Sequence, residues 1–425
     1  MNTPFPISKP KTRGRSHTVT SAHPSSSSPT SSSSPSTSPD TSTASPPITS
    51  VLRQTSGGRR RACPPSLMYW SRAPIIPPYP THAHAHTPKG VRSASCTVMD
   101  TAIWFFGGYD SKETVEDVWV LDTETREWER VEMRGEGPGP LRAHTAVGDE
   151  RYIFVFGGGS GDEFSDELWA LDTFEQTWHL LPCSAPSPVP RRAHNSFIYD
   201  EHLYVYGGGS GHDALSDLWR IDVSWAALAR SKDEPLVWEE LQTSGSAPSD
   251  MPVPGEEGSP EENTPRARGY TSATLVGNVL VVLGGQSGRD GDGEGPWGDC
   301  WVLNLDDLHW EEKHLNPPIP LASHTATLVG MYLFIFGGND GSRYCNDLRL
   351  LNLITMQWET PKIRGHPPPE RAQHQAVLVD ARLWIFGGFD GRRYFEEPYV
   401  LDLAASSWLM GVTEFGVGEE EEGWD

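Results

Sequence analysis

The chain repeats one short pattern six times, and this repetition constrains the fold more than any other feature of the sequence. In each copy an apolar run ends in two glycines, a second run ends in Asp or Asn, and a tryptophan follows. Most intervals between copies are close to 50 residues. Such a period predicts a repeat architecture, because a catalytic motif needs to occur only once. The glycine pairs are Gly107-Gly108, Gly157-Gly158, Gly207-Gly208, Gly284-Gly285, Gly337-Gly338 and Gly387-Gly388.

Each repeat contains four short runs with the character of β-strands. In the second repeat they read HTAVGD, RYIFVFGG, ELWALD and TWHLLP, with aromatic and β-branched residues bounded by turn residues. Four sequential strands with short connections form an antiparallel meander, which buries its faces only by stacking on neighbouring sheets. The sequence therefore predicts an all-β fold, a single β-propeller of six four-stranded blades. The glycine pair ends the second strand, and the tryptophan packs against the adjacent blade.

The double glycine, the following Asp-Val/Leu-Trp/Tyr-x-Leu/Ile-Asp and the spaced tryptophan resemble the kelch repeat. RAHTAV and FVFGGGSGDEFSDELWALD are most similar to the fungal kelch proteins of cell polarity and Ras-linked morphogenesis, the tip-elongation-aberrant type. The resemblance covers residues 66–412. It implies a kelch β-propeller that acts as a non-catalytic protein–protein interaction scaffold in cell polarity, morphogenesis or small-GTPase signalling. The alternative is a substrate-recognition subunit of a ubiquitin ligase, with the ligase contact on a separate subunit.

A tryptophan without a preceding repeat bears on how the ring closes. Trp70, in MYWSRAPI, looks like a fourth-strand tryptophan. Ring propellers are usually fastened by pairing the two chain ends within one blade, which removes open sheet edges. We therefore expect residues 68–74 to pair with the last blade near Arg382–Leu403, with the segment around Trp408 competing for that place or lying beside it. Six blades are favoured, and seven stay open.

Composition separates the propeller from two charged flanks. Residues 1–65 are rich in Ser and Pro, carry a net charge of +7 and are predicted to be a disordered tail, because they bury too little apolar area. Residues 413–425 form an acidic tail with a net charge of −6. The chain as a whole has a net charge of −23, so residues 66–412 carry −24. A ring this acidic argues against nucleic acid or an anionic membrane as its partner.

The remaining composition is typical of a cytosolic protein. No apolar run is long enough for a secretion signal or a membrane span. The five cysteines stand singly, without the spacing of metal ligands, and are read as reduced thiols. We therefore predict a cytoplasmic location, with the cell cortex as a candidate site and no membrane insertion. The oligomeric state is not indicated.

Catalytic and metal-binding chemistry finds little support in the sequence. Kelch propellers share a superfamily with galactose oxidase, which leaves such an enzyme as a remote alternative, but no Cys–Tyr–His–His set is recognisable. Four histidines recur before the first strands, and four imidazoles around a channel would suit a metal. The alternative is that each ring satisfies a neighbouring backbone group. We predict no enzyme activity, no metal site and no cofactor.

Topology indicates where a partner binds. In a four-strand meander, the loops after each glycine pair and before each first strand share one side of the ring, where long loops commonly carry binding sites. Arginines recur there, and guanidinium groups bind carboxylates and phosphates. We therefore expect protein partners, with acidic or phosphorylated peptides as ligands; the alternative is that these arginines pair with acidic neighbours and hold blades together. The predicted contact residues are Tyr109, Asp110, Arg142, His144, Arg192, His194, Arg268, Arg289, His324, Asn339, Asp340, Arg343, Arg371, His374, Phe389, Asp390 and Arg392.

Two insertions distinguish individual repeats. Residues 224–237 lengthen the connection between the third and fourth strands of the third repeat, on the face opposite the expected binding loops. Residues 244–265 are acidic and precede the fourth repeat, where they would overhang the binding face. They either occupy the arginines when no partner is bound or act as solvated filler.

Overall fold

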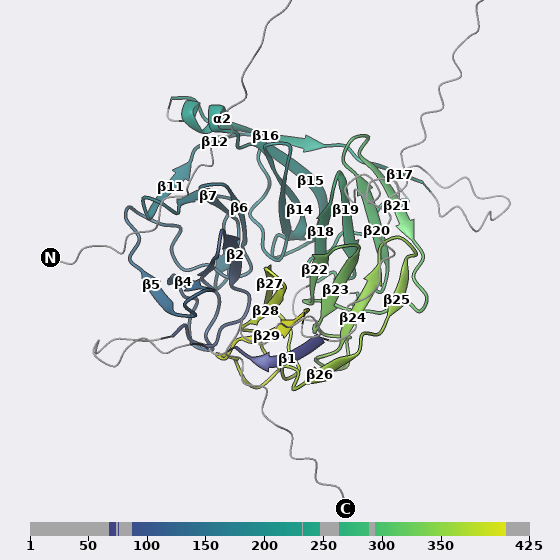
Figure 1. Cartoon of the computed structure of the whole chain (residues 1–425). Coiled ribbons are helices and arrows are strands. Elements are labelled where there is room, and N and C mark those ends of the chain that lie inside the picture. The colour runs from purple at the N-terminus through teal and green to yellow at the C-terminus, as the bar shows by residue number, and fades with distance from the viewer. Residues whose placement is uncertain are drawn as a thin grey trace, which may run out of the picture. The chain divides into compact units, whose positions relative to one another are not determined.

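The computed structural model of the chain describes residues 68–73, 75, 87–231, 233–246, 263–288 and 294–404. The predictions for the two tails, for Trp408 and for most of residues 244–265 lie outside these ranges. Within them the chain forms six sheets of mainly antiparallel strands arranged in a ring, as Figure 1 shows. We call each sheet a blade and number the blades from the repeat that contains Gly107.

Blades 1 to 3 follow one another along the chain, and the first strand of each lies nearest the centre of the ring. Blade 1 comprises β2 (Ser95–Met99), β3 (Ala102–Phe106), β4 (Val118–Asp122) and β5 (Trp128–Val131). Blade 2 comprises β6 (Thr145–Asp149), β7 (Tyr152–Phe156), β10 (Leu168–Asp172) and β11 (Thr177–Leu181), with a hairpin of β8 (Gly159–Ser160) and β9 (Glu163–Phe164). Blade 3 comprises β13 (Asn195–Tyr199), β14 (His202–Gly209), β15 (Ala214–Asp222), β16 (Leu236–Leu241) and β12 (Cys183–Ser184).

Blades 4 to 6 complete the ring. Blade 4 comprises β18 (Ser272–Val276), β19 (Val279–Leu283), β20 (Cys300–Asn304), β21 (His309–Lys313) and β17 (Ser244–Ser246). Blade 5 comprises β22 (Thr325–Val329), β23 (Tyr332–Phe336), β24 (Leu348–Asn352) and β25 (Gln357–Glu359). Blade 6 comprises β27 (Gln375–Val379), β28 (Arg382–Phe386), β29 (Tyr399–Asp402), β1 (Met68–Arg72) and β26 (Ile363–Gly365).

The first strand of the described residues, β1, closes the ring inside blade 6. β1 pairs antiparallel with β29, with Tyr69 opposite Asp402 and Arg72 opposite Tyr399. On its other side β1 pairs parallel with β26. The predicted closure by residues 68–74 is therefore confirmed for β1, and it fixes the number of blades at six. Trp70 is the tryptophan of the outer antiparallel strand of the last blade.

The hydrophobic core lies between blades rather than within them. Six clusters of buried side chains each join two neighbouring blades, including blades 6 and 1. An outer-strand tryptophan packs on an aromatic ring of the preceding blade in five of these interfaces, which confirms the predicted role of the tryptophans. The centroid distances are Trp128–Phe386 5.8 Å, Trp178–Phe106 5.2 Å, Trp238–Phe156 5.1 Å, Trp310–Tyr206 5.4 Å and Trp70–Phe336 5.3 Å.

The glycine pairs lie where the next blade comes closest. Gly337 has φ +64°, and a Cβ atom on it would stand 2.7 Å from the carbonyl oxygen of Arg371 and 2.7 Å from the ring of His374. Both neighbours belong to the segment that leads into blade 6. Any other residue would be strained in backbone conformation and would also push the blades apart, which explains why the pattern repeats with the blades.

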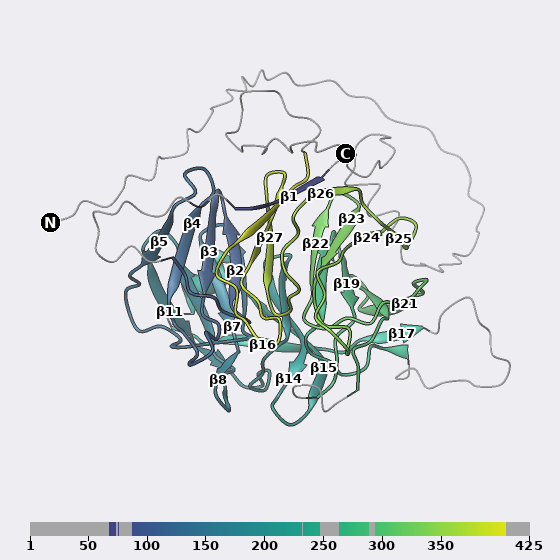
Figure 2. The same ribbon diagram turned by 90° about the horizontal axis from the view of Figure 1, so that it is seen from below.

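The connections on the two ends of the ring differ in length. Figure 2 shows the sheets from the side, with β8 and the ends of β14 and β15 projecting at one end. At the other end the strands are joined by tight turns, except in blade 3. There the connection contains helix α2 (Trp225–Arg230), whose first turn is capped by the Ser224 side chain through a hydrogen bond from the backbone N–H of Ala227. This helix lies within the predicted 224–237 insertion and forms six of its residues.

Candidate functional site

One end of the channel is bordered by two rows of residues that pair within each blade. The residue after each glycine pair forms an antiparallel bridge with a residue that precedes the first strand of the same blade. The two sets of loops therefore meet at one end of the ring, as the meander topology predicts. We call this ring of residues the channel mouth. Its bridges are Arg92↔Tyr109, Arg142↔Gly159, Arg192↔Gly209, Gly269↔Gln286, Ala322↔Asn339 and Ala372↔Phe389.

An arginine and four aromatic rings form a cluster on the channel mouth over blades 1, 5 and 6. The guanidinium carbon of Arg92 lies 5.1 Å from the ring centroid of Phe389, 5.5 Å from that of Tyr109 and 5.9 Å from that of Tyr394. The Tyr344 ring lies 6.0 Å from Phe389. All five residues are partly exposed. We call them the Arg–aromatic cluster; its cation–π contacts hold the guanidinium in a fixed place beside solvent.

Arginines at the same position of the next two repeats extend this positive region. The Arg142 guanidinium carbon lies 5.2 Å from the ring centroid of Tyr109, a member of the cluster, and that of Arg192 lies 4.7 Å from the ring centroid of Phe164. Arg142 is partly exposed, whereas Arg192 is only 7% exposed. Blades 1 to 3 thus carry guanidinium groups at the mouth, and blades 4 to 6 carry small residues there. Those small residues are Gly269, Ala322 and Ala372.

The predicted acidic contact residues shape their own loops. Asp340 Oδ1 accepts hydrogen bonds from the backbone N–H groups of Ser342 at 2.8 Å and Arg343 at 2.9 Å. Asp110 and Asp390 accept the corresponding pair of backbone bonds in blades 1 and 6. The Ser342 hydroxyl and these N–H groups lower the pKa of Asp340 to about 2. These carboxylates therefore stabilise the loops, and a partner would meet the residues around them.

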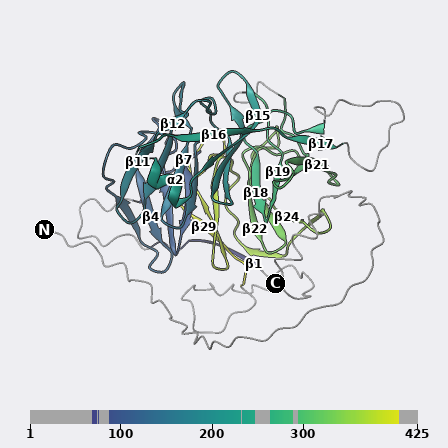
Figure 3. The same ribbon diagram turned by 90° about the horizontal axis from the view of Figure 1, so that it is seen from above.

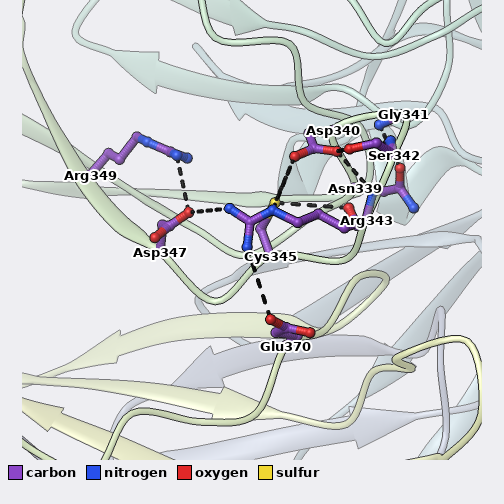
Figure 4. A network of polar contacts seen from close by, with 9 residues as sticks. All are labelled: Asn339, Asp340, Gly341, Ser342, Arg343, Cys345, Asp347, Arg349 and Glu370. Atoms are coloured by element: carbon purple, nitrogen blue, oxygen red, sulfur yellow. Dashed lines mark hydrogen bonds and ion pairs between the residues drawn. The ribbon is translucent and has the colours of Figure 1, made fainter.

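Arg343 stands at the outer end of one such loop, in the network that Figure 4 shows. Its guanidinium lies 3.4 Å from Asp340, 3.5 Å from Asp347 and 3.9 Å from Glu370, and its side chain is 56% exposed. Arg349 adds a contact of 3.1 Å to Asp347. Exposed pairs of this kind contribute about 0–1 kcal/mol, so a partner's carboxylate can replace them at little cost.

Three of the predicted contact arginines are buried: Arg192 lies over Phe164 at the mouth, whereas the guanidinium groups of the other two are bonded inside a blade. Arg268 and Arg371 are 1% and 0% exposed, and each donates to the carbonyl oxygen of the first glycine of its own blade, at 2.9 and 2.8 Å. Arg268 also forms two bonds of 2.7 and 2.8 Å with Asp299. Arg371 has the Phe395 ring at 4.1 Å, and burial lowers its pKa to about 10. A partner cannot reach either guanidinium in this structure, so we exclude both from the proposed surface.

We expect Asp299→Ala to destabilise the propeller more than Arg268→Leu. Removing the carboxylate leaves a guanidinium charge buried without its partner, which costs about 3 kcal/mol or more, whereas Leu leaves no charge behind and Asp299 is 22% exposed. Asp117→Ala is the matched control, because Asp117 stands at the same position in blade 1 and pairs with the exposed Arg130. Urea unfolding of the three variants gives the order. Equal losses for Asp299→Ala and Asp117→Ala would contradict the buried-pair interpretation.

The four recurrent histidines are buried between blades. His144, His194, His324 and His374 are 6%, 5%, 6% and 2% exposed. The Nε2 atom of each ring lies within 2.8–2.9 Å of a Ser or Thr hydroxyl on the inner strand of the preceding blade. The sequence predicted a backbone group as the partner of each ring. In the structure the partner is a side-chain hydroxyl instead. The histidines link blades, and we exclude them from the proposed binding surface.

The channel itself is narrow and polar. Its volume is about 290 Å³, and its walls come from the inner strands, with Ala, Ser and Thr side chains beside the four histidines. Among the residues that the structure describes, no three His, Cys, Asp or Glu side chains come together as a group that could hold a metal ion. Nor does any helix in the described part of the chain have the length and apolarity to span a membrane.

Sequence reasoning found part of the mouth and missed part of it. Tyr109 and Phe389 lie in the Arg–aromatic cluster, Asn339 borders the mouth, and Arg392 is exposed beside it, whereas Arg289 lies outside the described residues. Two rings of the cluster were not predicted, although a signal for them exists. The sixth residue after the second glycine is aromatic in three repeats. These residues are Phe164, Tyr344 and Tyr394.

Comparison with known proteins agrees with this architecture. Residues 68–253 and 256–417 match the KLHDC2/KLHL20/DRC7 Kelch-repeats domain, which accounts for most of the chain. The chain belongs to this Kelch-repeat family. Kelch propellers typically serve as protein-interaction or substrate-adaptor modules and are usually non-catalytic. The finer resemblance to the tip-elongation-aberrant type stays a prediction.

Two individual relatives match short stretches of the chain. The Kelch chain is 39% identical over 97 residues to acyl-CoA-binding domain-containing protein 5 of Arabidopsis thaliana, covering 22% of this chain and 14% of that protein. It is 34% identical over 107 residues to human host cell factor 1, covering 21% of this chain and 5% of that protein. The chain thus matches a small part of the length of either relative, and their whole-protein activities do not transfer to it.

Proposed function

We propose that this Kelch propeller is a non-catalytic scaffold that binds acidic or phosphorylated segments of partner proteins at the channel mouth. The family supports protein binding in general, and the geometry of the mouth supports the choice of ligand. We further propose cell polarity or small-GTPase signalling as the process and the cytoplasm, including the cell cortex, as the place. The proposed process and location rest only on the resemblance of the repeat sequences to fungal kelch proteins.

The placement of Arg92 carries the proposal. Its guanidinium lies against three aromatic rings, is partly exposed, and takes part in no ion pair with another described residue. This is unusual in a chain with a net charge of −23, where carboxylates are abundant. A guanidinium held beside rings needs little reordering to form charge-assisted bonds with an incoming carboxylate or phosphate. Arginine and tyrosine are also the residues that concentrate binding energy in protein interfaces.

Replacing Arg92 and Arg142 together with Ala should weaken partner capture and leave the melting temperature nearly unchanged. Loss of a desolvated charge-assisted contact costs about 2 kcal/mol, so we expect affinity for the main partner to fall at least about 30-fold. The measurement is quantitative mass spectrometry of proteins captured by the full chain from cell extract, followed by anisotropy titration of an acidic peptide from the main captured partner. Arg364→Ala is the control, because Arg364 is an exposed arginine on the outer strand β26.

The same experiment separates the alternatives. A folded double variant that keeps every partner at full affinity would remove the channel mouth from the proposal. A parallel loss of stability and capture would assign the two arginines to the fold instead. Ubiquitin-ligase subunits among the captured proteins would favour the substrate-receptor alternative, since Kelch propellers also serve as substrate adaptors.

A further inference from the structure

The ring has a second face, opposite the channel mouth, that carries exposed aromatic side chains. In blade 2, Tyr152 is paired with Asp149 on one neighbouring strand and with Asp172 on the other. Both turns that join these strands therefore lie at the end of the blade that contains Tyr152. Gly157 lies at the other end, where the mouth is. The same topology places the connection that contains α2 on the Tyr152 side of blade 3.

Three aromatic residues from three separate segments lie on this second face. Trp225 in α2 is 69% exposed, and Phe174 in the turn between β10 and β11 is 70% exposed. The Trp225 ring stacks on that of Tyr152, with centroids 6.4 Å apart and planes 28° apart. Figure 3 shows α2 beside β7 and β11 of blade 2. We call Tyr152, Phe174 and Trp225 the aromatic patch.

Folding of the ring does not account for the two exposed members of the patch. α2 is anchored through Ala227, which is 2% exposed and belongs to the core between blades 2 and 3. Trp225 is not a member of that core; it stacks on Tyr152 at the edge of the core and stays 69% exposed. Phe174 occupies a turn whose backbone is already fixed by bonds to Asp172. Large aromatic side chains exposed together commonly mark an interaction site.

The charges around the patch indicate what kind of partner fits it. Arg151 already lies 5.6 Å from the Tyr152 ring and 5.7 Å from the Phe174 ring, which shows that these rings accept a guanidinium. That charge is matched by Asp172, to which Arg151 is bonded at 2.9 Å. Further carboxylates lie in the turns of blades 2 and 3 on the same face, and all of them are exposed. They are Asp149, Glu150, Glu175, Asp200 and Glu201.

We propose that the aromatic patch is a second docking site, which takes a basic segment of a partner protein. An arginine of that segment stacks on Trp225, and neighbouring basic side chains pair with the carboxylates of the surrounding turns. Arginine is preferred over lysine, because its planar guanidinium stacks on aromatic rings as well as carrying charge. The propeller then holds an acidic segment at the channel mouth and a basic segment on the opposite face, and it brings two partners together.

The test uses the full chain and three fluorescein-labelled peptides of equal length, in which Gly-Ser spacers separate four Arg, four Lys or four Glu residues. Fluorescence anisotropy should show the Arg peptide binding most tightly and the Glu peptide not binding at this patch. Trp225→Ala should weaken Arg-peptide binding at least about fivefold. The double change Glu150→Lys and Glu175→Lys should weaken it further and reduce its dependence on salt.

Two controls make the outcome decisive. Val237→Ala removes an exposed apolar side chain of similar exposure, 64%, from the outer strand β16 and should leave binding unchanged. The Arg92→Ala and Arg142→Ala double variant should also leave it unchanged, so failure here is distinguishable from failure of the channel-mouth proposal. Equal binding of the Arg peptide by Trp225→Ala and the parent chain would overturn the inference. So would equal affinity for the Arg and Lys peptides, which would show that charge alone is recognised.

Discussion

Deleting residues 66–75 should lower the melting temperature far more than deleting residues 1–60. The smaller deletion removes β1, which lies between β29 and β26 in blade 6. Without it, the backbone groups of β29 lose their partners along an open sheet edge. Met68 and Trp70, 0% and 2% exposed, also leave the core between blades 5 and 6. The ring then has a gap at the one place where its two ends are joined.

A point substitution tests the same contact without shortening the chain. Trp70→Ala should cost about 3–5 kcal/mol of unfolding free energy, because it empties a buried site beside Phe336. Trp225→Ala is the matched control, since Trp225 is 69% exposed and its removal should cost less than about 0.5 kcal/mol. Urea unfolding measures both. Equal melting temperatures for the two deletions, or equal stabilities for the two tryptophan variants, would refute closure through β1.

The blade number and the closure could be predicted because both follow from local patterns. The spaced tryptophans mark outer strands, and Trp70 marks an outer strand whose repeat lies at the other end of the chain. The parallel edge strands could not be predicted in the same way. Residues Cys183–Ser184 have no strand pattern, yet they form β12 because they pass the outer edge of β16, whose inner edge pairs with β15. The formation of such edge strands depends on how neighbouring blades pack in the folded ring.

The arginines show why the candidate site was predicted only in part. Arg191 and Arg192 are adjacent in the chain, yet Arg191 is bonded to Asp217 inside blade 3 at 2.7 Å, and Arg192 lies over Phe164 at the mouth. An offset of one residue in an extended segment reverses the direction of a side chain. Arg268 and Arg371 occupy the inward position, which the sequence alone did not distinguish from the outward one. Which aromatic residues come together at the mouth also depends on which loops are neighbours in the folded ring, and this is not visible in the sequence.

Lowering the pH from 7.5 to 5.5 should destabilise the propeller by about 5 kcal/mol through its four buried histidines. Burial lowers the pKa of His144 to about 3 and that of His324 to about 4, and it holds the pKa of His194 and His374 well below 6.5. In the unfolded chain each of these groups titrates near 6.5. The unfolded state therefore binds more protons below this pH, and each histidine costs about 1.4 kcal/mol of stability over these two pH units.

Urea unfolding across this pH range tests the assignment residue by residue. His144→Gln should reduce the loss of stability between pH 7.5 and 5.5 by about 1.4 kcal/mol. Carboxylates such as Asp340, with a pKa of about 2, titrate below this window. An unchanged pH dependence in His144→Gln would show that its ring is already charged in the folded propeller.

The position of these histidines between the blades determines how low pH affects peptide binding at the mouth. Each ring bonds to a hydroxyl of the preceding blade, so protonation weakens the contacts between blades and leaves the loops of the mouth intact until the ring opens. The arginines of the mouth remain charged at both pH values. Binding of a glutamate-containing peptide at pH 5.5 should therefore fall only in proportion to the fraction of unfolded chain. A loss of affinity in fully folded protein at pH 5.5 would instead place a titrating group in the binding site.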